Sequence, residues 1–299
     1  MKKNMALSLV MILLLSFCMT SCASEHFVAY EEYRSYNAGT TGNQFGIPMP
    51  AEIDYWQGGD SFDKEDMAEQ SCSVLGTQYV GSYSGSKNGQ RRSYVTDYYD
   101  DEESGVEFGL RSDTGELVYV NFMNSNFWDV IESLPDVEDP YKTALSLGTE
   151  LAEEIVGDLT EYTLFPEEPY TNSRHTEYSI TFAKKIQEYW SYDYITVRVS
   201  SKGMVMSATA GEIGSFDHVT VNFDESAVEQ SILERIDSIY QNSGVTVSRN
   251  EISKHRVVLT PEGEVGIFTE AWSYLTSDDA DEETGVGIRW LTIIGRISK

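Results

Sequence analysis

The chain has 299 residues, enough for one large domain or for two to three small ones. It carries 49 acidic against 21 basic residues, a formal net charge of −28 at pH 7. A surface this negative repels nucleic acid and anionic lipid headgroups, so the composition excludes nucleic acid as a partner. Tyr, Val and Ile are interspersed among the acids, which indicates a folded protein rather than a disordered acidic tail.

The N-terminus has the layout of a secretory signal. Two lysines are followed by the apolar run ALSLVMILLLSF, and about a dozen apolar residues are typical of the hydrophobic region of such a signal. A helix that crosses a membrane needs about 20 apolar residues, so this run is too short to remain as an anchor. We therefore expect residues 1–21 to be a signal peptide that is removed.

The sequence MTSC, ending at Cys22, resembles the end of a bacterial lipoprotein signal, in which an aliphatic residue and two small residues precede a cysteine. Met19 departs from the usual leucine, and Cys18, preceded by Phe17, fits the pattern badly. The resemblance implies that Cys22 carries a diacylglyceryl group, whose two acyl chains anchor a protein stably to membrane lipid. It predicts a lipoprotein on the outer-facing side of the bacterial cell membrane. The alternative is an ordinary secretory signal with incidental cysteines.

The mature chain would be slightly more acidic than the precursor. Loss of residues 1–21 removes Lys2 and Lys3 and leaves 19 basic and 49 acidic residues, a formal charge of −30. Cys72 then has no disulfide partner and is most simply a buried small apolar residue. Residues 22–61 are rich in Gly, Thr, Asn and Pro and follow neither hydrophobic period, which predicts a tether. Its tyrosines and Trp56 leave open that part of it packs on the body.

Two pairs of segments in the body are similar to each other. SYVTDYYDDEESGVEFGL, from Ser93, aligns without a gap with SYLTSDDADEETGVGIRW, from Ser273, at an offset of 180 residues. Alternation on both sides of an acidic, glycine-containing turn predicts a β-hairpin in each copy. FDKEDMAEQS, from Phe62, similarly matches FDESAVEQS, from Phe223, and both are expected to be helical. The two pairs indicate duplication of a supersecondary unit.

Two further helices can be placed from their caps and apolar stripes. Asp139 is the predicted N-cap of one, with Pro140 at its first position. Its stripe at helical spacing is Ala144, Leu147, Leu151 and Ile155. The last helix is expected to begin near Ser226, where Glu229 completes a capping box. Its predicted buried face is Val228, Ile232, Ile236 and Ile239.

These patterns predict an α+β body of about three repeated units, each a helix packed on a small antiparallel sheet, over residues 62–135, 136–220 and 221–299. A helix followed by strands, with turns such as Asp113–Glu116 before an alternating strand, resembles the PepSY and PepSY-like modules of secreted and membrane-attached bacterial proteins. GELVYVNF and DYITVRVSSKGMVMSA carry most of the resemblance. It implies a non-enzymatic role in inhibiting or regulating peptidases, and it supplies no catalytic residue.

No catalytic residue, metal ligand or cofactor is predicted, and the chain is not expected to be an enzyme. Gly81–Gly85 reads GSYSG, which places Tyr83 where the nucleophile of a Gly-x-Ser-x-Gly elbow belongs. Zinc ligands usually include a closely spaced pair, whereas the histidines of this chain are scattered singly. We interpret as surface or internally satisfied residues His26, His175, His218 and His255.

Two features leave alternatives open. Asp279, Asp281 and Glu283 alternate like the first ligands of a calcium loop, but Gly285 comes one position too late for its turn. A solvated hairpin tip is favoured over a calcium site. The aromatic segment EYWSYDYI, Glu188–Ile195, is the best candidate for recognition of a partner. Its simpler interpretation is a long hairpin whose rings alternate between core and solvent.

The expected function is non-catalytic binding of an envelope protein or peptide by a membrane-anchored lipoprotein. One alternative is a solute-binding lipoprotein, which requires two α/β lobes with parallel sheets and crossovers. The other is a secreted hydrolase, which requires a histidine and two carboxylates brought together in a deep pocket. The strand arrangement and the surroundings of the histidines distinguish the three.

Overall fold

The structure is a computed structural model that describes residues 26–41, 61–88, 94–166, 169–171, 175–214, 216–217, 219–241, 245–260, 262–277 and 280–298. Cys22 and the predicted signal peptide lie outside the described residues. Those residues form fifteen β-strands and three α-helices. The predicted fold class, repeated helices on small separate sheets, is wrong, because the strands join into one large mixed sheet. No helix in the described part of the chain is both long enough and apolar enough to cross a membrane.

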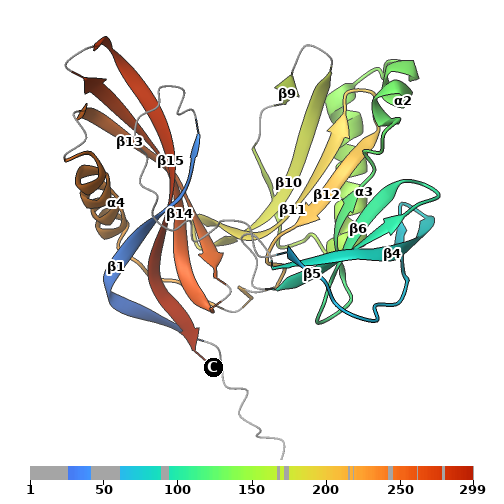
Figure 1. The fold of residues 1–299 in the computed structure, drawn as a ribbon, viewed down its shortest axis with the longest axis horizontal. Helices are drawn as coiled ribbons and strands as arrows, with labels where there is room; N and C mark the ends of the chain where they lie inside the picture. The colour runs from blue at the N-terminus through green and yellow to red at the C-terminus, as the bar shows by residue number, and fades with distance from the viewer. Residues whose placement is uncertain are drawn as a thin grey trace, which may run out of the picture.

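The sheet is divided between two lobes that meet at the centre of the molecule (Figure 1). The N-terminal lobe begins with β2 (Ser61–Phe62), β3 (Gln70–Val74), β4 (Thr77–Asn88), β5 (Val95–Asp101), β6 (Val106–Arg111) and β7 (Leu117–Asn121). It continues with α2 (Phe127–Ser133), α3 (Pro140–Val156), β8 (Thr163–Phe165), β9 (Tyr170–Thr171), β10 (Thr176–Ile186), β11 (Tyr189–Ser200) and β12 (Val205–Ala210). Because β12 pairs with β7, the first two predicted units share one sheet.

The C-terminal lobe combines the two ends of the described chain. It contains α4 (Glu225–Tyr240), β13 (Val245–Leu259), β14 (Glu264–Ser277), β15 (Ala280–Ser298) and β1 (His26–Thr41). β1 pairs antiparallel with β15, so part of the predicted tether is a strand of the fold. Its rings pack on both sides of the sheet, Phe27 and Tyr33 on one and Tyr30 and Tyr36 on the other. A bulge between Ala29 and Arg34 interrupts the alternation that would have revealed the strand.

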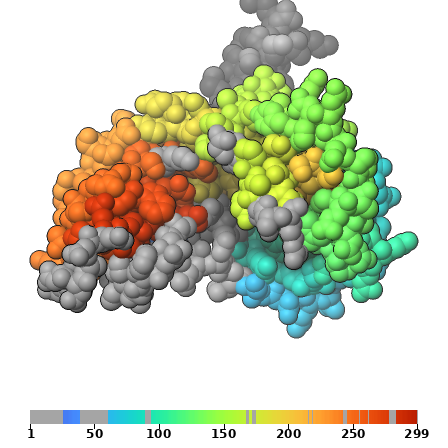
Figure 2. Space-filling view, turned by 90° about the horizontal axis from the view of Figure 1, so that it is seen from above, coloured from blue at the N-terminus to red at the C-terminus, as the bar shows by residue number. Residues whose placement is uncertain are grey.

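β11 is the strand that the two lobes share. Residues 195–199 of β11 pair with β12, whereas Trp190 and Ser191 pair in parallel with Arg256 and Val257 of β13. Every other strand pairing among the described residues is antiparallel. In the space-filling view, the orange and red C-terminal residues and the cyan residues of β4 accordingly lie on opposite sides (Figure 2).

The helices confirm the predictions that rest on local signals and correct two others. Asp139 caps α3 by accepting a hydrogen bond from the Lys142 backbone, and Pro140 begins the helix. The cap of α4 is Asp224 rather than a box with Glu229, since its side chain accepts from the backbone N–H of Ala227. The helix expected from Phe62 is absent, because this segment pairs with β4 through β2 and β3. Asp66 has a φ of 57°, which is incompatible with a right-handed helix.

Both predicted hairpins form, but their turns lie at different aligned positions. In β5–β6 the last pair is Asp101 with Val106, so the acidic segment makes the turn. In β14–β15 the last pair is Ser277 with Ala280, four positions before the aligned turn. The acids from Asp281 onward therefore belong to β15 and do not form a hairpin tip.

Candidate functional site

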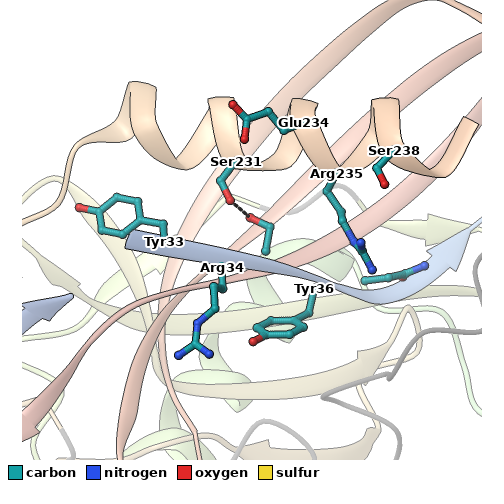
Figure 3. Close-up of a pocket in the computed structure, with 9 residues that line it drawn as sticks. Tyr33, Arg34, Tyr36, Ser231, Glu234, Arg235 and Ser238 are labelled. Atoms are coloured by element: carbon teal, nitrogen blue, oxygen red, sulfur yellow. Dashed lines mark hydrogen bonds between the residues drawn. The ribbon is translucent and has the colours of Figure 1, made fainter. Parts of the chain in front are cut away.

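A groove of about 410 Å³ runs along β1 beside α4 (Figure 3). Ligand pockets commonly have volumes of about 300–1,000 Å³. The groove is lined by five consecutive residues of β1 and four of α4: Tyr33, Arg34, Ser35, Tyr36, Asn37, Ser231, Glu234, Arg235 and Ser238. It is larger than two other cavities lined by the described residues, of about 260 and 120 Å³, and unlike them it contains two arginines.

The groove extends around the edge of β1. In Figure 3, Ser231 and Arg235 point from α4 toward β1, whereas Arg34 and Tyr36 lie on the opposite side of the strand. Among the described residues β1 pairs only with β15, so it ends the sheet on this side. An edge strand presents backbone N–H and C=O groups that can pair with another extended chain.

Hydroxyl groups hold β1 against α4 inside the groove. The Ser35 Oγ lies 2.9 Å from the Ser231 Oγ and 2.5 Å from the Thr292 Oγ1 of β15. Near the start of α4, the backbone N–H of Asp224 donates to the Tyr33 hydroxyl at 3.2 Å. The contacts of Ser35 with Ser231 and of Tyr33 with Asp224 join the strand to the helix, so the groove is formed without a ligand.

The charge of the groove is opposite to that of the chain. Arg34 and Arg235 outnumber the single acid, Glu234, in the lining, whereas the whole chain has a net charge of −28. A guanidinium group binds carboxylates through two parallel hydrogen bonds. The lining therefore suits an anionic group that the rest of the surface repels.

The aromatic segment Glu188–Ile195 lies at the junction of the lobes. The Trp190 ring meets the Phe165 ring edge-on at 4.9 Å, and the Lys185 ammonium lies 4.4 Å from its centre. Tyr192 is buried against Phe268 of the C-terminal lobe. The rings of the segment are buried or half-buried. Trp190, Tyr192 and Tyr194 line a cavity of about 120 Å³, which is smaller than a usual ligand pocket.

Asp193, in the same segment, is fully buried within a hydrogen-bonded network. Its carboxylate accepts from the Tyr162 hydroxyl at 2.6 Å and from the Gly214 backbone at 2.9 Å, and Lys184 Nζ lies 3.6 Å away. Burial raises the pKa of Asp193, and these partners oppose the shift. The network ties the loops before β8 and after β12 to β11, which is a structural role.

The histidines are placed differently from one another. His26 is exposed at the start of β1, and His175 stacks beside Trp128 at 4.2 Å; His218 lies outside the described residues. The Nε2 of His255 lies 3.4 Å from the Glu225 Oε1 and 3.7 Å from the Glu229 Oε1. The interpretation of four isolated histidines overlooked this cluster. Its one signal in the sequence is two glutamates one turn apart at the start of a helix, which face a strand that is distant along the chain.

In the first copy of the hairpin, an aspartate at the acidic turn accepts hydrogen bonds from the backbone. Asp101 accepts hydrogen bonds from the backbone N–H groups of Glu103, Ser104 and Val80. The bond from the Ser104 backbone, followed by those from Val80 and Glu103, lowers the pKa of Asp101, and burial opposes the shift. In the second copy, Asp279 lies outside the described residues and Glu283 contacts Ser248 and Arg249.

The free cysteine does not form a nucleophilic site. Cys72 is half-buried on β3. Burial, followed by the negative charges of Glu154 and Asp101, raises the pKa of its thiol to about 11. The thiol is therefore protonated at neutral pH, and a protonated thiol is a poor nucleophile.

Comparisons with protein-family models, curated proteins and solved structures find no match to this chain. The resemblances to PepSY-like modules and to a lipoprotein signal therefore remain predictions from the residues. Among the described residues, the β1–α4 groove combines a volume of about 410 Å³, a strand that ends the sheet and two arginines.

Proposed function

We propose that this chain is a lipid-anchored protein of the bacterial cell envelope that binds, without catalysis, an extended acidic segment of a partner protein or peptide in the β1–α4 groove. The observation that carries the proposal is an edge strand flanked by Arg34 and Arg235 on a strongly acidic chain. Pairing of a peptide with an exposed strand edge supplies affinity, and pockets for its side chains supply specificity.

The positions of the two arginines suit an extended ligand. Successive side chains of a strand point to opposite faces of a sheet. Arg34 lies on the side of β1 that faces away from α4, and Arg235 comes from α4 itself (Figure 3). A segment paired with β1 can therefore direct neighbouring acidic side chains to the two arginines.

The predicted anchor would hold this groove close to the membrane. Cys22 precedes Tyr33, the first residue of β1 that lines the groove, by eleven positions. An extended chain spans at most about 3.6 Å per residue, so the lipid and the groove are separated by at most about 40 Å of chain. A partner on the same membrane surface is therefore within reach. The PepSY-like resemblance would make that partner a peptidase or a product of one.

The two alternative functions fit the structure less well. The lobes share one mixed sheet whose parallel pairing is confined to two residue pairs in the described part, and not crossover-linked parallel sheets. The histidine and two carboxylates required for a hydrolase do meet at His255. However, the side chains of Glu225 and Glu229 are 51% and 43% exposed, so they lie at an open surface and not in a deep pocket.

Peptide binding can be tested with the full chain in detergent. A labelled, end-blocked peptide of alternating Val and Asp is titrated and followed by fluorescence anisotropy, with a peptide of alternating Val and Lys as the control. Loss of a charge-assisted hydrogen bond costs about 1.5–3 kcal/mol, so Arg34→Ala and Arg235→Ala are each expected to weaken binding about tenfold or more. Arg249→Ala, on β13 outside the groove, is the matched control. Equal binding of both peptides, or equal loss in all three variants, would contradict the proposed groove.

The anchor is tested separately, so that its failure is distinguishable from failure of the groove. Cys22→Ala is expected to release the protein from the membrane fraction after a carbonate wash, whereas Cys18→Ala is expected to leave it anchored. Retention of the Cys22→Ala protein would refute lipidation at this residue.

A further inference from the structure

We infer that Glu225, Glu229 and His255 form a binding site for a divalent transition-metal ion, and that Zn²⁺ fits their chemistry best. Imidazole nitrogen and carboxylate oxygen are both common zinc ligands. The site is separate from the groove beside β1, and the inference is independent of the proposed peptide binding.

The distances within the cluster match those around a tetrahedral ion. His255 Nε2 lies 3.4 Å and 3.7 Å from the nearest oxygens of Glu225 and Glu229, and all three ligand atoms lie within 4.8 Å of one another. Ligands that each bind zinc at about 2.0–2.2 Å in a tetrahedron are about 3.3–3.6 Å apart. The two histidine–carboxylate distances therefore need almost no adjustment to admit the ion.

The histidine is buried and oriented for this role. Its side chain is 8% exposed, and its Nδ1 lies 2.8 Å from the Oγ1 of the buried Thr269 on β14. When Nδ1–H donates to Thr269, the lone pair of Nε2 points at the two carboxylates, which is the tautomer that a metal ligand requires. Among the described residues, Nε2 makes no hydrogen bond that would occupy this lone pair.

A bulge in β13 places His255 on the side of the sheet that faces α4. Ser253 pairs with Glu270 and Arg256 with Phe268, so β13 has one residue more than β14 in this interval. Val257 packs in the core beneath α4, and His255, two positions earlier, shares its face. β-Bulges commonly redirect a side chain next to a functional site.

Neither glutamate is balanced by a lysine or an arginine of the described residues. Glu225 and Glu229 lie one turn apart at the start of α4 and are not paired with lysine or arginine in the described part of the chain. The Tyr189 hydroxyl donates to the Glu225 Oε2 at 3.2 Å, which leaves Oε1 directed at His255. Three protein ligands leave a fourth position for water or for an anionic group.

Metal binding is tested with the full chain in detergent, stripped with EDTA and titrated with Zn²⁺ by calorimetry, with the rise in Tm as a second readout. We expect one ion per chain. Glu229→Gln and His255→Ala are each expected to weaken binding at least about a hundredfold, because a three-ligand site loses a ligand. Asp237→Asn, an exposed change on the same helix, removes one charge but is expected to leave the affinity unchanged.

Thr269 is a positioning residue, and its role has a test of its own. Loss of such an outer partner costs about 10–100-fold in metal affinity, so Thr269→Val is expected to weaken binding by this factor and Thr269→Ser to restore it. The visible spectrum of Co²⁺-loaded protein reports whether coordination is tetrahedral. Two results would overturn the inference: no binding of Zn²⁺ by the chain without substitutions, or equal affinity in Glu229→Gln and Asp237→Asn. The cluster would then be only an ion pair between His255 and the two glutamates.

Discussion

The two lobes have the same plan, a helix on an antiparallel sheet, but their helices pack by different means. α3 buries Ala144, Gly148, Leu151 and Ala152, mostly small residues. α4 buries Val228, Ile232, Ile236 and Tyr240, all large. Small residues let the backbone of α3 approach its sheet closely. Between α4 and its sheet, branched and aromatic side chains fill the space. Removing volume should therefore be the harmful change beneath α4, and adding volume the harmful change beneath α3.

The largest effect is expected from removing volume beneath α4. Ile232 is fully buried in the core of the C-terminal lobe. Ile232→Ala is expected to lower the free energy of unfolding by about 2–5 kcal/mol, because it leaves a cavity that the sheet cannot fill. Urea unfolding measures the loss, and Asp237→Asn on the exposed face should change it by less than about 0.5 kcal/mol. A loss no larger than that of the control would show that α4 is not packed as described.

Adding volume should be harmful beneath α3. A Cβ on Gly148 would lie 2.7 Å from the Cβ of Ile180 on β10, a branched side chain held within the sheet. Gly148→Ala is therefore expected to destabilise the chain by about 1–3 kcal/mol, although alanine is the better helix former. Ser146→Ala, at an exposed position of α3, introduces the same residue without the clash and should be neutral or stabilising. Stabilisation by Gly148→Ala would refute the close approach.

The two similar hairpins provide a third comparison. Asp101 binds three backbone N–H groups at its turn, whereas the aligned Asp281 lies within β15. Asp101→Ala is expected to cost about 1–3 kcal/mol at pH 7, because it leaves three backbone donors without their acceptor. Glu283→Ala, in the second copy, is expected to cost less, because the contacts of Glu283 with Ser248 and Arg249 are exposed.

The contribution of Asp101 should depend on pH. Its pKa is lowered in the folded state, so its stabilisation is present above the unfolded pKa of about 3.9 and is lost as the pH falls through the folded pKa. The difference in unfolding free energy between the unmodified chain and Asp101→Ala should be constant from pH 7 to about pH 5 and shrink below about pH 4. A difference that persists at low pH would assign the effect to packing.

The smallest effect is expected on the labelling rate of a thiol in the N-terminal lobe. Cys72 lies in the N-terminal lobe, and residues 225–298 contain no cysteine. Because the pKa of its thiol is raised to about 11, alkylation at pH 8 should be slow in the native chain and fast in urea. The labelling rate of Cys72 itself therefore reports opening of the N-terminal lobe. Ile232→Ala should leave this rate unchanged if the lobes unfold separately, and raise it if β11 couples them.

Local signals in the sequence predicted the elements that depend on neighbouring residues. Asp139 and Pro140 identify the start of α3, and the apolar spacing of α4 identifies most of its buried face, because caps and helical periodicity act within a few residues. Both hairpins are predicted for the same reason, but only the first has its turn in the predicted acidic segment. The segment from Phe62 was assigned to a helix wrongly, because its pairing with β4 overrides local preference.

The start of α3, most of the buried face of α4 and the presence of both hairpins could thus be predicted from the sequence by itself, because each depends on a short stretch of chain. Only the tertiary structure decided that β1 joins β15, that β11 links the lobes and that His255 meets Glu225. Alternation specifies which face of a strand is buried but not which strand lies beside it. The groove and the histidine–glutamate cluster are both products of such long-range pairing, so neither has a local signature.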